Sequence, residues 1–160
     1  MFRIGFGNDT HRLEANKPLI LGGVKVESDL GAVGHSDADA LLHAVTDAIL
    51  GALALGDIGA HFSDQDERWK NADSLVFLRE AVRMMQEKGF SIVNVDSVIN
   101  LETPKLRPYI DKMRENLAEN LEIEIGFISV KAKTGERVDA VGNRLAVKTE
   151  AIVLLEKNRD

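Results

Sequence analysis

The segment 34–55, GHSDADALLHAVTDAILGALAL, decides the expected fold because its apolar residues recur with the 3.6-residue spacing of an amphipathic helix. Its buried stripe consists of Leu41, Leu42, Val45, Ala48, Ile49 and Ala52. We expect Ser36 to be the N-cap and Asp39, three residues later, to complete a variant of the capping box. The helix N-terminus after Gly34 also offers unpaired backbone N–H groups and a positive dipole end, which suit a phosphate.

Strand-like and helical segments surround this helix. Strands are expected at 2–7, 19–26 with Gly22 and Gly23 as a bulge, 90–102, 126–134 and 145–157, and further helices at 74–89, capped by Asp73, and 109–123. The long segment 56–72 is a candidate substrate lid, since loops of that length are unusual in compact domains. The order predicts an α+β fold with a mixed sheet of four to five strands and helices packed on one face. With no repeat or linker, residues 1–160 are expected to form a single domain.

Composition excludes several classes of protein. The 160 residues are 44% hydrophobic and carry a formal charge of -6, which argues against a phosphate-backbone binder, so no nucleic-acid partner is expected. The absence of long apolar runs and of a signal-peptide pattern predicts a soluble cytoplasmic protein that has no membrane partner. Without any cysteine, a metal must be held by histidine and carboxylate groups.

If residues 5–13 leave the first strand in extended form, Asp9 and His11 project to the same side and are candidate metal ligands. His43 lies between Asp39 and Asp47 at i, i+4 spacing on one helix stripe and is a candidate third ligand. Taken singly, each has a simpler structural interpretation, namely a capped turn with a surface histidine, a histidine at the core edge or a solvated helix face. Together, one oxygen and two nitrogen ligands suit zinc with one open position.

The ordered motifs RIGFGNDTHRL, LILGGV, the segment 34–66, WKNADS and PKLRP resemble the 2-C-methyl-D-erythritol 2,4-cyclodiphosphate synthase family of the non-mevalonate isoprenoid pathway. The resemblance runs over nearly the whole chain. It implies conversion of 4-diphosphocytidyl-2-C-methyl-D-erythritol 2-phosphate into the cyclic diphosphate with release of CMP. It also implies a homotrimer with active sites between subunits, and zinc held by Asp9, His11 and His43.

The resemblance assigns further roles, position by position. A second cation, magnesium or manganese, is expected on Glu136, while His35 and Thr134 stabilise the transition state around the phosphates. Ser36 is expected to contact the methylerythritol phosphate, and Asp57 and Gly59 the sugar hydroxyls. The remaining substrate-binding residues are the lid residues Phe62, Asp64 and Asp66, the cytidine-binding segment Thr103, Pro104, Lys105 and Leu106, and Lys133.

Departures from the family pattern gather between Lys133 and Leu145. Ser63 also replaces the proline of the lid motif, and Lys133 replaces a threonine. Asp139, Ala140, Asn143 and Leu145 replace Gly, Phe, Arg and Glu, and Arg144 lies one place after the usual arginine. Those positions line the trimer's central cavity in the family, so binding of isoprenoid diphosphates there is not carried over.

Two other classes use the same residues. A zinc-dependent nucleotide-diphosphate hydrolase would employ water with a lowered pKa and release a linear phosphate. A non-catalytic nucleotide- or metal-binding protein would use the ligands alone. The retained Thr134 and Glu136 speak against the second class.

Overall fold

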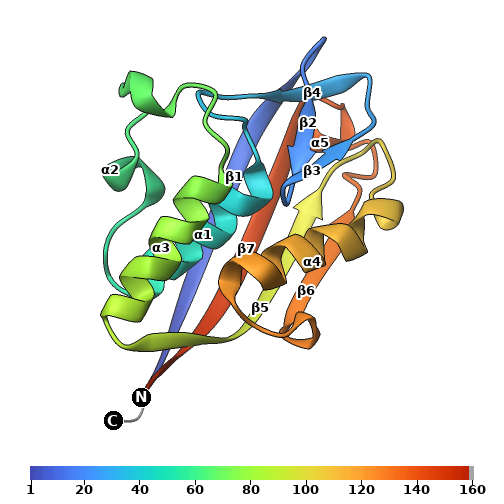
Figure 1. The fold of residues 1–160 in the computed structure, drawn as a ribbon. Coiled ribbons are helices and arrows are strands. Elements are labelled where there is room, and N and C mark those ends of the chain that lie inside the picture. Colours follow the sequence, from blue (N-terminus) through green and yellow to red (C-terminus); the bar gives the residue numbers. More distant parts are fainter. Residues whose placement is uncertain (159–160) are drawn as a thin grey trace.

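A mixed five-stranded sheet forms the centre of the molecule (Figure 1). The structure is a computed structural model, and it describes residues 1–158. The strands are β1 (Phe2–Ala15), β4 (Leu30–Val33), β5 (Phe90–Asn100), β6 (Ile128–Lys133) and β7 (Ala146–Lys157), in the spatial order β4-β1-β7-β5-β6. Neighbours are antiparallel except β5 and β6, which are parallel. The α+β prediction and the mixed sheet are therefore confirmed.

Three helices form a layer on one face of this sheet, as Figure 1 shows. They are α1 (Ala40–Ala52), α3 (Leu75–Glu87) and α4 (Ile110–Leu121). The alternation of β7 explains why this face is covered: Val147, Thr149, Ala151, Val153 and Leu155 are all buried, and every residue between them is more exposed. The apolar stripe of α1 packs on β1 and β7, while α3 lies against α1 and α4 against β6.

The backbone of α1 approaches β1 unusually closely. A Cβ atom at Gly5 would lie 1.7 Å from the carbonyl oxygen of Ala48, and one at Gly7 would lie 2.1 Å from that of Ala44. Only glycine fits these two positions. The pair of glycines thereby brings the helix that carries His43 against the strand that carries Asp9 and His11.

Helix α1 begins later than expected. Its N-cap is Asp39 rather than Ser36, and the helix starts at Ala40. The Asp39 carboxylate accepts from the backbone N–H of Leu42 at 3.1 Å and also from those of Gly22 and Gly23, at 2.9 and 2.6 Å. Tertiary contacts therefore decide between two competing caps. Burial raises the pKa of Asp39 to about 6, although the three N–H groups oppose this shift.

The expected strand 19–26 is instead a hairpin of β2 (Leu19–Leu21) and β3 (Val24–Val26). Gly22 and Gly23 form its turn with φ of 59° and 70°, so the expected bulge was wrong. Strand β1 continues to Ala15, well past the expected end at residue 7, and the four-residue β4 was not predicted. Both additions follow from pairing, since β4 adds to the end of β1.

Segment 56–72 is more ordered than a plain loop. It contains α2 (Ile58–His61) and a 3₁₀ turn, η1 (Glu67–Trp69). Two further 3₁₀ turns and a short helix lie elsewhere, η2 (Arg107–Tyr109), η3 (Ile125–Phe127) and α5 (Asp139–Gly142). The N-cap of α3 is Ser74 rather than the expected Asp73, although the Asp73 carboxylate accepts from the N–H of Leu75 at 2.9 Å.

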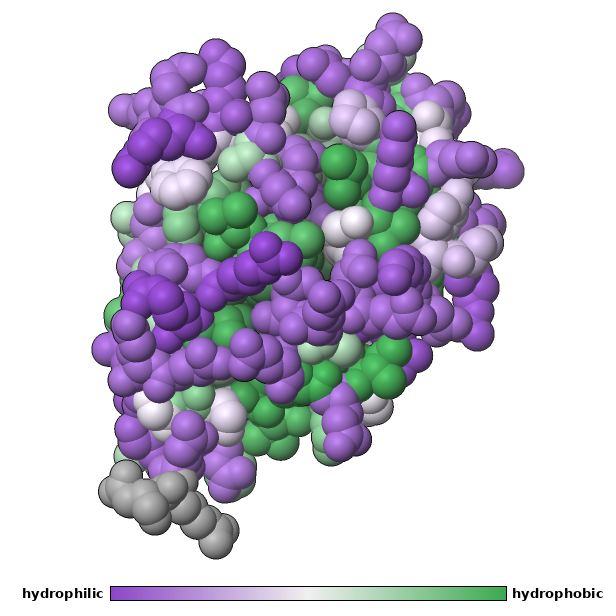
Figure 2. Space-filling model, in the orientation of Figure 1, coloured by the Kyte–Doolittle hydropathy of each residue, from purple (hydrophilic) through white to green (hydrophobic). Residues whose placement is uncertain are grey.

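The two faces of the molecule differ in polarity. The helix-bearing side is mainly hydrophilic, with hydrophobic residues showing between the polar ones (Figure 2). On the opposite face of the sheet, Phe2, Ile4, Phe6 and Ile152 are exposed, Ile4 to 72%. Among residues 1–158, none of the helices is long and apolar enough to cross a bilayer.

Candidate metal centre and active site

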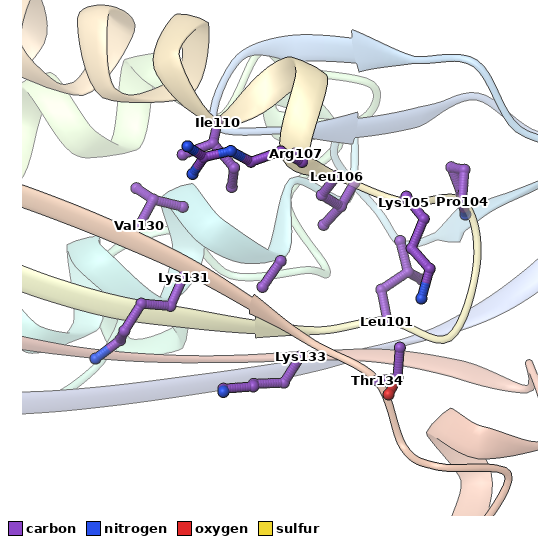
Figure 3. Close-up of a pocket in the computed structure, with 11 residues that line it drawn as sticks. Leu101, Pro104, Lys105, Leu106, Arg107, Ile110, Val130, Lys131, Lys133 and Thr134 are labelled. Atoms are coloured by element: carbon purple, nitrogen blue, oxygen red, sulfur yellow. The ribbon is translucent and has the colours of Figure 1, made fainter.

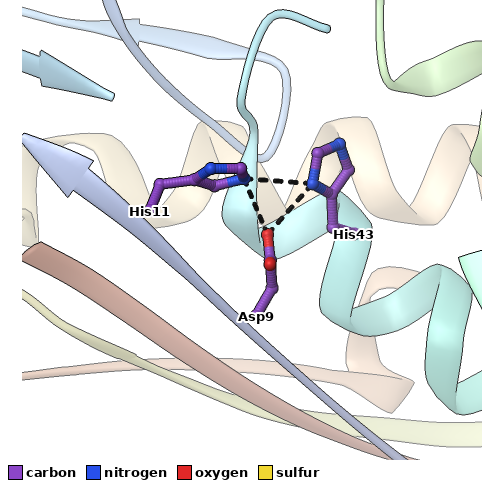
Figure 4. Close-up of side chains that lie close together, drawn as sticks. All are labelled: Asp9, His11 and His43. Atoms are coloured by element: carbon purple, nitrogen blue, oxygen red, sulfur yellow. Dashed lines mark hydrogen bonds and ion pairs between the residues drawn. The ribbon is translucent and has the colours of Figure 1, made fainter. Parts of the chain in front are cut away.

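Asp9, His11 and His43 point toward one another at the junction of β1 and α1 (Figure 4). Asp9 Oδ2 lies 2.8 Å from His11 Nε2 and 3.0 Å from His43 Nδ1. The two ring nitrogens are 3.2 Å apart. Strand alternation brings Asp9 and His11 to the helix side of the sheet, and the helical position of His43 turns its ring to meet them.

Charge within this group shifts the protonation of its members. Burial would raise the pKa of Asp9, but hydrogen bonds and the charges of His11 and His43 outweigh it and hold that pKa well below its usual range. For His11, burial acts to lower the pKa, but Asp9 and the Val33 carbonyl raise it above the ordinary value. His11 therefore holds its proton more tightly than an ordinary histidine, and a metal ion bound to this group would have to displace that proton.

The donor set fits a divalent metal ion. In the described part of the chain, three or more histidine, aspartate or glutamate side chains bring their ligand atoms within 4.8 Å of one another in one group, which consists of Asp9, His11 and His43. His11 Nδ1 is 3.0 Å from the Val33 carbonyl oxygen, which leaves its Nε2 free to face the group. One carboxylate oxygen and two imidazole nitrogens suit zinc and leave a position open. The predicted convergence of these three residues is confirmed.

A cavity of about 400 Å³ opens beside the metal group. Predicted site residues that line it are His11, His35, Ser36, His43, Gly59, Phe62 and Asp64. Ser36 Oγ lies 3.2 Å from His43 Nε2, and His35 Nε2 lies 3.1 Å from the Asp66 carbonyl oxygen. The expected lid segment thus forms one wall of the cavity.

A second cavity, of about 410 Å³, lies between β6 and the start of α4 (Figure 3). It is lined by the predicted residues Pro104, Lys105, Leu106, Lys133 and Thr134. Its apolar residues include Leu101 and Ile110, and its cationic residues also include Arg107 and Lys131. None of the described residues that line it carries a carboxylate. Such a site suits a base or sugar on the apolar part and phosphate groups beside the lysines.

Besides Asp9 of the metal group, four predicted residues line neither cavity. Asp57 caps α2 through the N–H of Ala60 at 2.9 Å, and the Asp66 side chain pairs with Arg68 at 2.6 Å. Thr103 precedes Pro104, and Glu136 Oε1 accepts from Thr134 Oγ1 at 2.6 Å. Because Thr134 lines the second cavity, this hydrogen bond places Glu136 beside that cavity. Glu136 is not a member of the metal group.

Sequence reasoning missed several cavity residues. Trp69 and Phe77 line the first cavity, and Phe62 packs against both with ring centroids 5.5 and 4.7 Å away. Phe62 and Trp69 belong to the expected lid, and Phe77 lies just after it on α3, in a chain that is only 5% aromatic. That local concentration was the signal that could have identified them.

Comparison with known proteins identifies the family. The model of the YgbB family matches residues 2–156. The chain belongs to the YgbB family. The match covers both cavities and the metal group.

Several similar proteins share one name. A 2-C-methyl-D-erythritol 2,4-cyclodiphosphate synthase from Solibacter usitatus is 56% identical over 97% of this chain and 98% of its own length. The synthase from Fusobacterium nucleatum is 52% identical over 99% of both chains. A solved structure of a synthase of this name in a CDP-bound form has a TM-score of 0.89 and 42% identity, covering 96% of this chain and all of its own. The predicted family and enzyme class are therefore confirmed.

Proposed function

We propose that the chain converts 4-diphosphocytidyl-2-C-methyl-D-erythritol 2-phosphate to the cyclic diphosphate and CMP, as the names of its YgbB relatives indicate. The observation that carries the proposal is the convergence of Asp9, His11 and His43 beside an open cavity in a member of that family. The reaction forms a bond from a 2-phosphate oxygen to the β-phosphorus and breaks the bond to the CMP oxygen.

The chemistry needs little from a protein nucleophile. A phosphate monoester has a second pKa near 6 and is therefore already largely ionised at neutral pH. The main task is to hold the attacking oxygen in line with the leaving CMP, which can lower the barrier by about 7–11 kcal/mol in favourable cases. The walls contributed by Phe62, Trp69 and Phe77 would exclude water from that arrangement.

We assign zinc to Asp9, His11 and His43, and magnesium or manganese to Glu136. When bound, such cations supply positive charge that stabilises the phosphoryl oxygens in the transition state. The oxygen and nitrogen donors suit zinc, whereas a lone carboxylate beside phosphates suits magnesium.

The remaining assignments follow the two cavities. His35 and Ser36, in the first cavity, would donate hydrogen bonds to the phosphates, and Asp57 with Gly59 would meet the sugar hydroxyls. Lys105, Lys133 and Thr134, in the second cavity, would bind the diphosphate beside the cytidine. Asp64 and Asp66 would act with the lid, and the backbone from Thr103 to Leu106 would contact the base.

A homotrimer with active sites between subunits explains two features of the chain. The two cavities share no lining residue, so the first cavity of one subunit and the second of a neighbour would together hold the substrate. The exposed apolar residues Phe2, Ile4, Phe6 and Ile152 would be covered by neighbouring subunits. Residues 1–160 would form one synthase domain in each subunit, and the cytoplasmic location stays a prediction.

A phosphorus NMR time course tests the proposed reaction against hydrolysis. The protein, substrate, zinc and magnesium are mixed, and the His43→Ala variant is followed in parallel. Cyclic diphosphate and CMP should appear together in the wild type and not in the variant. A linear phosphate with CMP would favour the hydrolase, and unchanged substrate despite bound zinc would favour a binding protein.

A further inference from the structure

A chain of hydrogen bonds leads from the outer side of the His43 ring to a carboxylate that lies outside the metal group. His43 Nε2, the ring nitrogen that points away from Asp9 in Figure 4, lies 2.8 Å from Ser74 Oγ. Ser74 Oγ is in turn hydrogen-bonded to Asp37 Oδ1. Asp37 Oδ2 also accepts from the Ser74 backbone N–H at 3.2 Å. Two contacts thus fix Asp37 against Ser74.

The direction of the protons follows from the chemistry of the groups. A carboxylate only accepts hydrogen bonds, so the single hydroxyl proton of Ser74 goes to Asp37. Ser74 Oγ then has only lone pairs to offer His43, and Nε2 must carry the ring proton. The neutral ring is left with its lone pair on Nδ1, which is the nitrogen that faces Asp9 and His11.

Ser74 is placed for this role rather than for capping. It occupies the N-cap position of α3, yet its side chain makes no capping hydrogen bond to the helix. The residue is completely buried, and burial strengthens hydrogen bonds between polar groups. Ser36 Oγ lies farther from the same ring nitrogen, at 3.2 Å, and also accepts from the Ala38 N–H.

His11 reaches the same result by a simpler route. Its Nδ1 lies 3.0 Å from the Val33 carbonyl oxygen, which can only accept, so its Nε2 is left with the lone pair. Both histidines of the group therefore have a partner that selects which ring nitrogen faces the centre. Such outer partners typically alter metal affinity by about 10–100-fold when removed.

We propose that Ser74 and Asp37 are positioning residues that hold His43 as the Nε2–H tautomer and aim its Nδ1 at the metal. The inference rests on the proposed metal site of Asp9, His11 and His43. It adds a hydroxyl and a carboxylate from two separate segments to that site. Because the Asp37 N–H also donates to the Ala72 carbonyl oxygen at 3.0 Å, the arrangement is tied to the end of the lid segment.

The test measures zinc affinity and the His43 ring proton in the full-length chain. Zinc dissociation constants are obtained by competition with a chromophoric chelator for the wild type, Ser74→Ala, Ser74→Thr and Asp37→Asn. Proton NMR of the zinc-loaded proteins follows the His43 Nε2–H signal. Ser97→Ala is the matched control. Like Ser74, Ser97 is buried and its hydroxyl donates a hydrogen bond, in this case to the Ser129 carbonyl oxygen at 2.9 Å.

Ser74→Ala and Asp37→Asn should weaken zinc binding by about 10–100-fold and lose the slowly exchanging ring proton. Ser74→Thr, which keeps the hydroxyl, should stay close to wild type, as should Ser97→Ala. Wild-type affinity and an intact ring proton in Ser74→Ala and Asp37→Asn would overturn the inference while leaving the metal site standing. Failure of the wild type to bind zinc would overturn both, and zinc binding without cyclic product would overturn the proposed function alone.

Discussion

Replacing Gly7 by alanine tests whether the close approach of α1 to β1 creates the metal site. The added Cβ would lie 2.1 Å from the Ala44 carbonyl oxygen and 2.7 Å from the Ala48 nitrogen. Both atoms belong to the backbone of α1, so no side chain can turn away to make room. Because contacts below 3.0 Å essentially never occur for a Cβ, the helix must move away by about 1 Å.

That movement is large compared with what a metal site tolerates. Ligand distances vary by only about 0.2 Å, and His43 is adjacent to Ala44 on the displaced helix. We expect Gly7→Ala to lower the free energy of unfolding of the metal-free protein by about 3 kcal/mol, the upper end for overpacking. Its zinc dissociation constant should rise by more than about tenfold.

Gly51→Ala is the matched control because it adds the same methyl group to α1, on the other side of the contact between this helix and β1. Its nearest neighbour would be the Phe6 carbonyl oxygen at 3.8 Å, an ordinary contact. Alanine is the better helix former, so this variant should be more stable by up to about 1 kcal/mol. Urea unfolding and zinc competition measure both effects. Equal stability and zinc affinity of Gly7→Ala and the wild type would refute the reasoning.

Three further predictions concern protons, assembly and the second cation. Burial acts to lower the pKa of His11, but the opposing effect of Asp9 is larger, so the pKa is raised overall. The bound proton therefore stabilises the metal-free fold at low pH and competes with zinc for His11. The increase in Tm caused by zinc should therefore grow from about pH 6 to about pH 8; a constant increase would contradict this. Ile4→Glu should dissociate the proposed trimer in light-scattering measurements, whereas Val76→Glu, on α3, should not; an intact Ile4→Glu trimer would place the interface elsewhere. Glu136→Gln should raise the magnesium concentration needed for half-maximal activity by about tenfold while zinc affinity stays unchanged; unaltered magnesium dependence would remove Glu136 from the second site.

The metal group could be predicted from the sequence because each ligand follows from local geometry. The two-residue period of a strand places Asp9 and His11 on one side, and the helical period places His43 beside the apolar stripe. Only the meeting of the two elements depends on a tertiary contact, since Gly5 and Gly7 let α1 approach β1 closely. The helix and most strands were predictable for the same reason. The bulge predicted at Gly22 and Gly23 was wrong because glycine is typical of both bulges and hairpin turns.

Features that depend on tertiary contacts could not be predicted in this way. Ser36 and Asp39 both fit the capping pattern, and the N–H groups of the hairpin turn select Asp39. Likewise, Ser74 is separated from His43 by 31 positions, and only the path of the lid segment brings its hydroxyl to the ring. A serine at a helix start predicts a cap, not a partner for a metal ligand.

The most direct test of the account is anomalous diffraction at the zinc edge from crystals of the zinc-loaded protein. If these three residues hold zinc, one strong peak per chain should lie at about 2.0–2.2 Å from Asp9 Oδ2, His11 Nε2 and His43 Nδ1. The same peak should be absent from His43→Ala crystals. A zinc peak held by other residues, or no peak within bonding distance of these three atoms, would contradict the central claim that this group is the metal centre.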